Sequence, residues 1–191
     1  MTNPTIELLK TRRSVKADLL AAPAPTAEEL DTILTLAARV PDHKKLAPWR
    51  FVVIEGAARE QLGEIAAEAC RREEAEPPSP VRLDTERKRF LRAPLVVAVV
   101  SRVEETRGAP EWEQILSAGA SAMTLCIAAN ALGYGTVWIT EWISYSRHFT
   151  SQFGLAPNER IAGFVHIGTA TERPADRERP DLATIVSRWG A

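Results

Sequence analysis

A short basic cluster near the N-terminus is the first part of this sequence that could bind a ligand. Arg12, Arg13, Ser14 and Lys16 place two guanidinium groups, one hydroxyl and one ammonium within five residues, at the end of a predicted helix. Such a set can hold a phosphate group by charge-assisted hydrogen bonds. A cluster this short is equally typical of a solvated basic helix end, so both interpretations stay open on these residues alone.

Two further basic segments could approach the same kind of ligand. The loop Asp42-His43-Lys44-Lys45 separates a predicted buried helix from a predicted strand, and this position makes His43 a candidate ligand-binding residue. The C-terminal tail carries Arg173, Arg177 and Arg179 among prolines. A tail stiffened by proline could close over the same anion, although such tails are also typical of a solvated surface.

The glycine, histidine and cysteine patterns favour neither a nucleotide fingerprint nor a metal site. Gly133-x-Gly135 follows a predicted helix and precedes a predicted strand, which reverses the order of a dinucleotide-binding fingerprint. The sequence has no GxxxxGK[ST] run, no HExxH motif and no GxSxG elbow. Cys70 and Cys126 form no CxxC pair and predict neither a zinc site nor a disulfide framework. We therefore expect no bound metal.

Composition and charge are those of a compact globular protein. The 191 residues are 45% hydrophobic, which is enough to build a sizeable core in one domain covering residues 1–191. The 24 Lys and Arg residues nearly balance the 25 Asp and Glu residues, so neither nucleic acid nor an anionic membrane is an expected partner. The N-terminal residues lack a signal-peptide pattern, and no apolar run reaches the roughly 20 residues needed to span a bilayer. We expect a cytoplasmic protein.

The hydrophobic pattern predicts both helices and strands. Helices are expected over residues 5–13, 26–38, 57–76, 112–132 and 144–153. Strands are expected over residues 49–54, 95–100, 136–140 and 161–168. Thr26 with Glu29 three residues later forms a capping box at the start of the second helix.

Two of these elements indicate where the core lies. Residues 95–100 form an unbroken apolar run of strand length, which is typical of a central strand covered on both faces. Residues 112–132 are small and apolar with almost no charge, so we expect a helix that is buried all round. This helix is either the central helix of the domain or part of a dimer interface, and we favour both.

The order of several segments along the chain is more specific than any one of them. These segments are Arg12-Arg13-Ser14 after a helix, Arg39-Val40-Pro41-Asp42-His43-Lys44, Pro48-Trp49-x-Phe51-x-Val53-Ile54, the small-residue helix, Gly133-Tyr134-Gly135-Thr136-Val137-Trp138, and Gly163-Phe164-x-x-Ile167-Gly168 before the arginine tail. In this order they resemble the nitroreductase family of FMN enzymes, over nearly the whole chain. The resemblance is closest to the short branch of that family with Pro-Asp-His in the second loop.

The resemblance implies a fold and an assembly. It implies an α+β, nitroreductase-like fold with a central, mainly antiparallel sheet flanked by helices. It also implies an intertwined homodimer with two FMN sites at the subunit interface. Residues 59–92 resemble nothing closely, and we expect a variable, polar and mobile helical segment there.

The resemblance also implies cofactor-binding residues. It places Arg12, Arg13 and Ser14 on the ribityl and phosphate oxygens of FMN, and Lys16 near the flavin ring. Arg39 and His43 match loop residues that reach the FMN of the neighbouring subunit.

Two later segments complete the implied flavin site. Trp138, Ile139 and Thr140 match a strand end beside the isoalloxazine, where a backbone N–H can donate to flavin N5. Arg177 and Arg179 match a tail that closes on the phosphate.

The implied activity is FMN-dependent transfer of reducing equivalents from NADH or NADPH to a small-molecule acceptor by a ping-pong mechanism. A nitroaromatic, a quinone or a similar conjugated compound fits as acceptor. No side-chain acid or base is obligatory because the cofactor carries the chemistry, so we name no catalytic residue. Alternatives are a flavin-binding carrier or sensor with little turnover, and a narrower superfamily enzyme such as a dehydrogenase, a dehalogenase or a flavin-consuming enzyme.

Three positions depart from the family pattern. Lys45 and Ala47 stand where many relatives have Asn and Gln, which removes expected polar contacts with the flavin. Glu141 stands where Gly is frequent, and we expect it to narrow the site or to repel an anionic substrate. The physiological acceptor, the preference between NADH and NADPH, and a lid role for residues 59–92 stay open.

Overall fold

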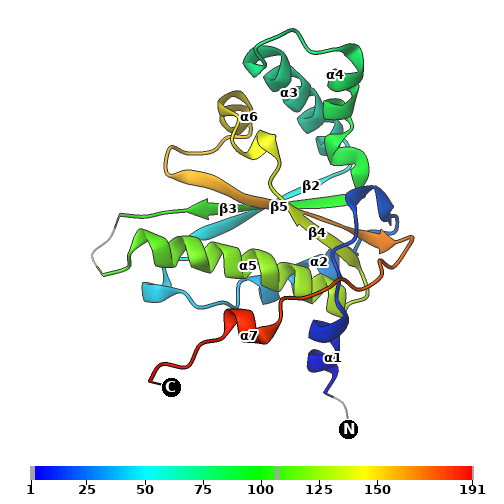
Figure 1. The fold of residues 1–191 in the computed structure, drawn as a ribbon. Helices are drawn as coiled ribbons and strands as arrows, with labels where there is room; N and C mark the ends of the chain where they lie inside the picture. Colours follow the sequence, from blue (N-terminus) through cyan, green and yellow to red (C-terminus); the bar gives the residue numbers. More distant parts are fainter. Residues whose placement is uncertain (1–2, 106–107, 191) are drawn as a thin grey trace.

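The computed structural model describes residues 3–105 and 108–190, in which a five-stranded antiparallel sheet lies between helices (Figure 1). The strands are β1 (Leu20–Ala21), β2 (Trp49–Glu55), β3 (Leu95–Arg102), β4 (Gly135–Ile139) and β5 (Glu159–Ala170). The strand order is β1-β5-β3-β2, and β4 also pairs with β5. β5 is 12 residues long, so it has length enough to pair with three strands.

Helices cover both faces of this sheet. They are α1 (Pro4–Thr11), α2 (Ala27–Ala37), α3 (Ala58–Glu73), α4 (Pro80–Arg87), α5 (Glu111–Ala131), α6 (Arg147–Gln152) and α7 (Leu182–Ile185). Short 3-10 turns are η1 (Ala17–Leu19), η2 (His43–Lys45), η3 (Arg89–Arg92) and η4 (Trp142–Ser144). Figure 1 shows α2 and α5 on one side of the sheet and α3, α4 and α6 on the other.

β3 lies between β2 and β5 and has a core on each of its faces. Val97 and Val99 pack with α2 and α5, whereas Val96 and Ala98 pack with α3 and α6. All four side chains are fully buried. The prediction of a central strand covered on both faces is therefore confirmed.

The capping box at the start of α2 is also confirmed. The backbone N–H of Glu29 donates to the Thr26 hydroxyl over 3.3 Å, and the Thr26 N–H donates to the Glu29 carboxylate over 2.8 Å. These bonds satisfy two of the N–H groups that a helix start leaves without partners.

The structure corrects several predicted elements. β1 was not predicted because two residues carry no periodic signal. The predicted helix over residues 144–153 is divided between η4 and α6, since α6 begins at a Ser146 cap, whose hydroxyl accepts the N–H of Phe149 over 3.0 Å. The polar segment 59–92 is helical as expected and holds α3, α4 and η3; α3 and η3 pack on the sheet through Ala66, Ala69 and Phe90, whereas α4 packs on α3.

The prediction that the small-residue helix is buried all round is wrong for the single chain. α5 buries the face that carries Ala118, Ala122 and Leu125, but Trp112 is 66% exposed and Leu116 is 53% exposed. By length and composition α5 could also cross a membrane, yet half of its most apolar window is buried in the fold, as in a core helix.

Candidate functional site

α1 brings the N-terminal basic cluster to the edge of the sheet. Asn3 caps the first turn of α1, and the helix ends where Arg12 adopts an extended backbone. The backbone N–H of Val15 then donates to the carbonyl of Thr136 over 2.9 Å, and Ser14 forms a parallel bridge with the same residue. The cluster and the start of β4, far apart in sequence, therefore lie side by side.

A cavity of about 220 Å³ opens between α1, the end of α5, the start of β4 and the C-terminal tail. Its polar wall consists of Thr11, Arg12, Arg13, Asn130 and Arg173. The Arg12 Nε donates to the Asn130 Oδ1 over 3.3 Å, which orients that guanidinium. The Asn130 Nδ2 donates to the Tyr134 carbonyl and to the Thr136 hydroxyl, so Asn130 orients Arg12 and is not itself a free donor. Three guanidinium groups around one cavity form a donor set suited to a phosphate.

Close packing behind this cavity requires glycine at position 135. A β-carbon there would lie 2.7 Å from Leu20 Cδ2 and 3.1 Å from Ala170 Cβ. Gly133, just past the end of α5, has φ +94°, a conformation that favours glycine. The two glycines therefore serve a helix end and close packing.

The C-terminal tail reaches the cavity through Arg173, while Arg177 and Arg179 are exposed in the single chain and do not line it. The Arg13 guanidinium contacts the carbonyl of Ala175 and lies 3.7 Å from the carboxylate of Asp176. These contacts tie the tail to the N-terminal cluster.

Three polar residues of this cavity, Thr11, Asn130 and Arg173, were absent from the predicted site. Asn130 directly follows the apolar residues 125–129 near the end of α5, and that contrast was the available signal. Arg173 was noted in the tail but not selected, because nothing in the sequence says which tail arginine returns to the sheet.

The end of β4 is held from both sides. The Trp138 indole crosses onto β5, where its Nε1 donates to the Ala162 carbonyl over 3.0 Å. Ile139 and Thr140 are half-buried, and the Thr140 carbonyl accepts the Ser144 hydroxyl. Lys16 is exposed just before η1, and η1 packs against η3.

The loop after α2 is strained and is fastened by one carboxylate. Lys44, Lys45 and Ala47 have φ values of 62°, 56° and 46°, a region that side chains disfavour. The Asp42 carboxylate accepts the N–H of Leu46 over 3.0 Å and that of Ala47 over 2.9 Å. These bonds explain how the loop keeps this conformation without glycine.

Arg39 and His43 are exposed on this loop region and do not line the cavity of Arg12. The His43 Nδ1 lies 2.6 Å from the Glu113 Oε2 at the start of α5. Within one chain, Arg39 and His43 therefore lie apart from the N-terminal basic cluster.

Glu141, two residues after β4, has φ +56° and ψ +173°, a backbone region that is otherwise almost restricted to glycine and that costs on the order of 1–3 kcal/mol. Its carboxylate binds Arg92 through two contacts, at 3.1 and 2.6 Å, and Arg89 at 2.7 Å. Burial alone would raise the pKa of Glu141, but the hydrogen bonds from Arg92 and Arg89 outweigh it and lower the pKa. Two guanidinium groups therefore neutralise this carboxylate within the fold, and its effect on an anionic substrate stays a prediction.

The thiols and the acidic groups indicate no further reactive centre. Cys70 and Cys126 are buried, and burial raises the pKa of Cys126 to about 11, so it stays a neutral thiol. Across residues 3–105 and 108–190, no three His, Cys, Asp or Glu side chains are grouped so that they could hold a metal ion.

These features define a class of protein. An antiparallel sheet with helices on both faces carries an arginine-lined cavity where the N-terminal helix, the small-residue helix and the C-terminal tail meet. That arrangement is an α+β protein with a basic cavity at one edge of its sheet.

Comparisons with known proteins give the family. The model of the family described as "Nitroreductase family" matches residues 9–169. The Escherichia coli (strain K12) protein described as "Putative NAD(P)H nitroreductase YdjA" is 38% identical over 164 residues, which are 86% of this chain and 87% of that protein.

Solved structures share the fold. A nitroreductase-like family protein from Bacillus cereus has a TM-score of 0.84 and 23% identity, covering 100% of this chain and 98% of that one. A nitroreductase with bound FMN from Bacteroides fragilis has a TM-score of 0.69 and 21% identity, covering 98% and 99% of the two chains. The chain belongs to the nitroreductase family, a family of oxidoreductase enzymes.

Proposed function

We propose that this chain binds FMN, with the phosphate in the cavity lined by Arg12, Arg13, Asn130 and Arg173. The observation that carries the proposal is the convergence of three guanidinium groups on one cavity beside the start of β4. Their charge and fork geometry suit a phosphate dianion, so these residues fit the cofactor. The relatives named NAD(P)H nitroreductases and the FMN-bound fold relative support the same cofactor.

The proposed activity is NAD(P)H-dependent reduction of a nitroaromatic, a quinone or a similar conjugated acceptor. The chemistry that bound FMN supplies is two-electron transfer in two separate half-reactions, which is a ping-pong scheme. The chain's own residues bind and orient the reactants. Lys16 would place a positive charge beside the ring, and Trp138 would form an apolar wall.

A cavity of about 500 Å³ supports a conjugated acceptor. It lies between α5, the end of β3 and the start of β5, and its apolar wall includes Ile115, Trp138 and Ala162. A planar apolar substrate could stack there, next to the strand end proposed to hold the flavin ring.

A flavin carrier or sensor with little turnover is the second candidate function. The strained Lys44-to-Ala47 loop, which lacks the usual amides, favours it, because fewer contacts are left to orient a second substrate.

We further propose that residues 1–191 form one FMN-binding domain of a cytoplasmic homodimer. Apolar side chains that the single chain leaves exposed support the assembly, above all Trp112 on α5 and Leu182 and Trp189 in the tail, with 66%, 69% and 103% exposure. In this assembly Arg39 and His43 act on the FMN of the other subunit, and Arg177 and Arg179 belong to the tail that closes on the phosphate.

The function is tested by adding NADH or NADPH, without oxygen, to purified protein that shows a flavin spectrum. Bleaching of the yellow absorbance is the expected result. Bound flavin that does not bleach would exclude the reductase and support the carrier or sensor function. A protein that binds no FMN even when FMN is supplied would exclude both flavin functions.

The shared site is tested by forming mixed dimers from two defective variants. If each site uses Arg12 of one subunit and His43 of the other, a dimer of Arg12→Ala with His43→Ala keeps one intact site. Mixing should then restore up to about half of the flavin binding per heterodimer. Equal defects before and after mixing would contradict sites shared between subunits.

A further inference from the structure

The segment that follows β4 is anchored to the helical segment 80–92 by a chain of alternating charges. Glu86 on α4 is fully buried and binds Arg89 through two contacts of 2.5 Å. Arg89 in turn binds Glu141, which also binds Arg92. These contacts therefore link Glu86 on α4, through Arg89 on η3, to Glu141, which lies two residues after the end of β4.

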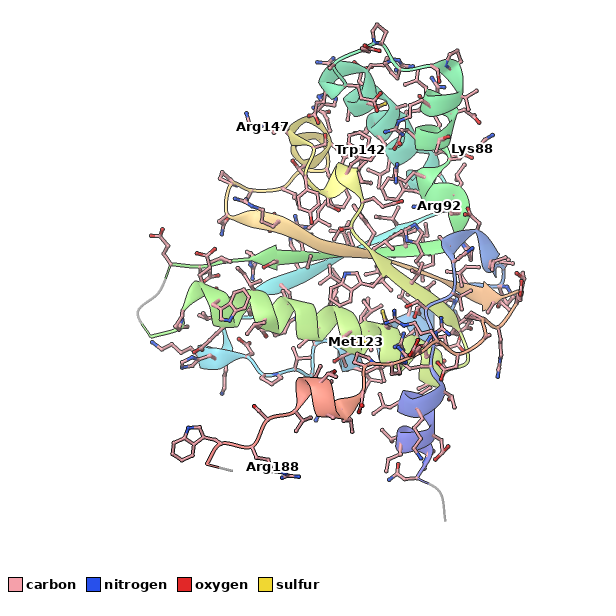
Figure 2. The ribbon with its side chains drawn as sticks, in the orientation of Figure 1. Lys88, Arg92, Met123, Trp142, Arg147 and Arg188 are labelled. Carbon is pink, nitrogen blue, oxygen red and sulfur yellow. The ribbon has the colours of Figure 1, made fainter. Side chains whose placement is uncertain are left out.

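Neighbouring groups complete this network. The Trp142 Nε1 donates to the Glu86 Oε1 over 3.2 Å, and the Arg82 guanidinium contacts the same carboxylate. The Arg92 Nε donates to the Arg89 carbonyl over 2.8 Å. Figure 2 shows Trp142 and Arg92 on the side of the sheet that carries α3 and α4. Both residues next to the strand end, Glu141 and Trp142, are thus fastened to Glu86 or its partners.

The backbone conformation of Glu141 is one that its anchored side chain must hold in place. With φ +56° and ψ +173°, glycine would adopt the conformation freely, whereas glutamate opposes it. The conformation persists because the carboxylate is held by three contacts to two guanidinium groups, and one of these, Arg89, is itself only 8% exposed. A glycine would permit the same backbone without holding it there.

We propose that Glu141 is a positioning residue for the flavin ring: held by Arg89 and Arg92, it fixes the backbone of residues 139–141 at the end of β4. The inference rests on the FMN site proposed above. In that site the position of the flavin ring depends on Glu141, whereas the phosphate is bound in the separate cavity lined by Arg12. The inference also makes residues 80–92 a fixed support of the site.

The test compares Glu141→Gly, which frees the backbone, with Glu141→Gln, which keeps the side-chain length and removes the charge. Glu68→Gln is the matched control, because two arginines, Arg71 and Arg72, also hold the Glu68 carboxylate, on the exposed face of α3. The first readout is amide hydrogen exchange over residues 140–143 in protein without FMN. Exchange should be faster in both Glu141 variants and unchanged in the control.

The second readout uses the FMN-loaded protein. Both Glu141 variants should lower kcat for NADH or NADPH oxidation with menadione by about tenfold, as expected when a reacting group is misplaced. They should shift the reduction potential of bound FMN, while the dissociation constant of FMN changes by less than about threefold because the phosphate cavity is intact.

The outcomes separate this inference from the proposed function. Wild-type protein that binds no FMN would overturn the proposed function, and with it a role for Glu141 in that site. FMN binding with unchanged kcat and potential in both variants would overturn the inference alone. Faster exchange without those changes would show an anchor of purely structural value, which also overturns it.

Discussion

The Trp138 indole occupies the space that a side chain at position 163 would need. A β-carbon on Gly163 would lie 1.9 Å from Trp138 Nε1 and 2.2 Å from its Cδ1. Trp138 pairs with Val165 across β4 and β5, two residues along β5 from Gly163, and the indole donates to the neighbouring Ala162 carbonyl. This close approach sets the position of the aromatic wall at the proposed flavin site.

Replacing Gly163 by alanine should destabilise the protein by on the order of 1–3 kcal/mol, because the indole or the strand must move. Urea unfolding measures the change. In a Trp138→Ala background the same substitution should cost much less, since the clash is gone. Equal costs in the two backgrounds would show that the indole does not occupy this space.

Replacing Gly63 by alanine should separate α3 from α4. A β-carbon there would lie 2.0 Å from the Arg87 carbonyl oxygen, a backbone atom that cannot move alone. We expect a loss on the order of 1–3 kcal/mol in thermal or urea unfolding. Gly119→Ala is the control within α5, where the nearest atom is 4.0 Å away and alanine should stabilise by up to about 1 kcal/mol. Similar losses for both would contradict the close α3–α4 approach.

Acid should weaken the fold through His166, which is 1% exposed. Burial, followed by the charge of Arg92, lowers the pKa of His166 to about 4 from its ordinary value of 6.5. The unfolded state therefore binds a proton that the folded state refuses, and stability falls between pH 6.5 and about pH 4, by roughly 3 kcal/mol. Unfolding of His166→Leu should show a flatter profile over that range. An identical slope in the variant would contradict this assignment.

Below that range the Arg50–Glu159 pair should dominate. Two contacts of 2.7 and 2.8 Å join the groups, and the hydrogen bond from Arg50 lowers the pKa of Glu159 to about 2. A lowered carboxylate pKa contributes stability that is present above pH 4.5 and is lost as pH falls toward 2. Glu159→Gln should cost about 1–3 kcal/mol at neutral pH and flatten this acid range, as urea unfolding at several pH values would show. Glu68→Gln, in an exposed ion pair, should change the free energy of unfolding very little. An equal loss there would show that the burial of Glu159 does not set the size of the effect.

The phosphate cavity predicts the strongest effect on cofactor affinity. Arg12→Ala combined with Ser14→Ala should weaken FMN binding by on the order of 3 kcal/mol, because charged hydrogen bonds contribute roughly 1.5–3 kcal/mol each. Flavin fluorescence titration measures the dissociation constant. Lys10→Ala is the control, because Lys10 is an exposed cation on the same helix that pairs with Glu7 and does not line the cavity. Unchanged affinity in the double variant would refute the phosphate role.

Local signals in the sequence were sufficient for much of the fold. The apolar run of β3 predicted a central strand because both faces of such a strand must be buried, and the Thr26–Glu29 pair predicted the start of α2 because helix N–H groups need partners. The ordered motifs also identified the family, and the basic cluster at Arg12–Ser14 lines the cavity or borders it.

Contacts between distant segments could not be obtained in this way. Only the tertiary structure decided that Asn130 and Arg173 join Arg12, and that Arg177 and Arg179 stay exposed, because the return path of the tail depends on packing and not on local pattern. The same holds for Glu141. From the sequence we expected its charge to narrow the site or to repel an anionic substrate. The fold places Arg89 and Arg92 against Glu141, so that the charge fastens the end of the strand.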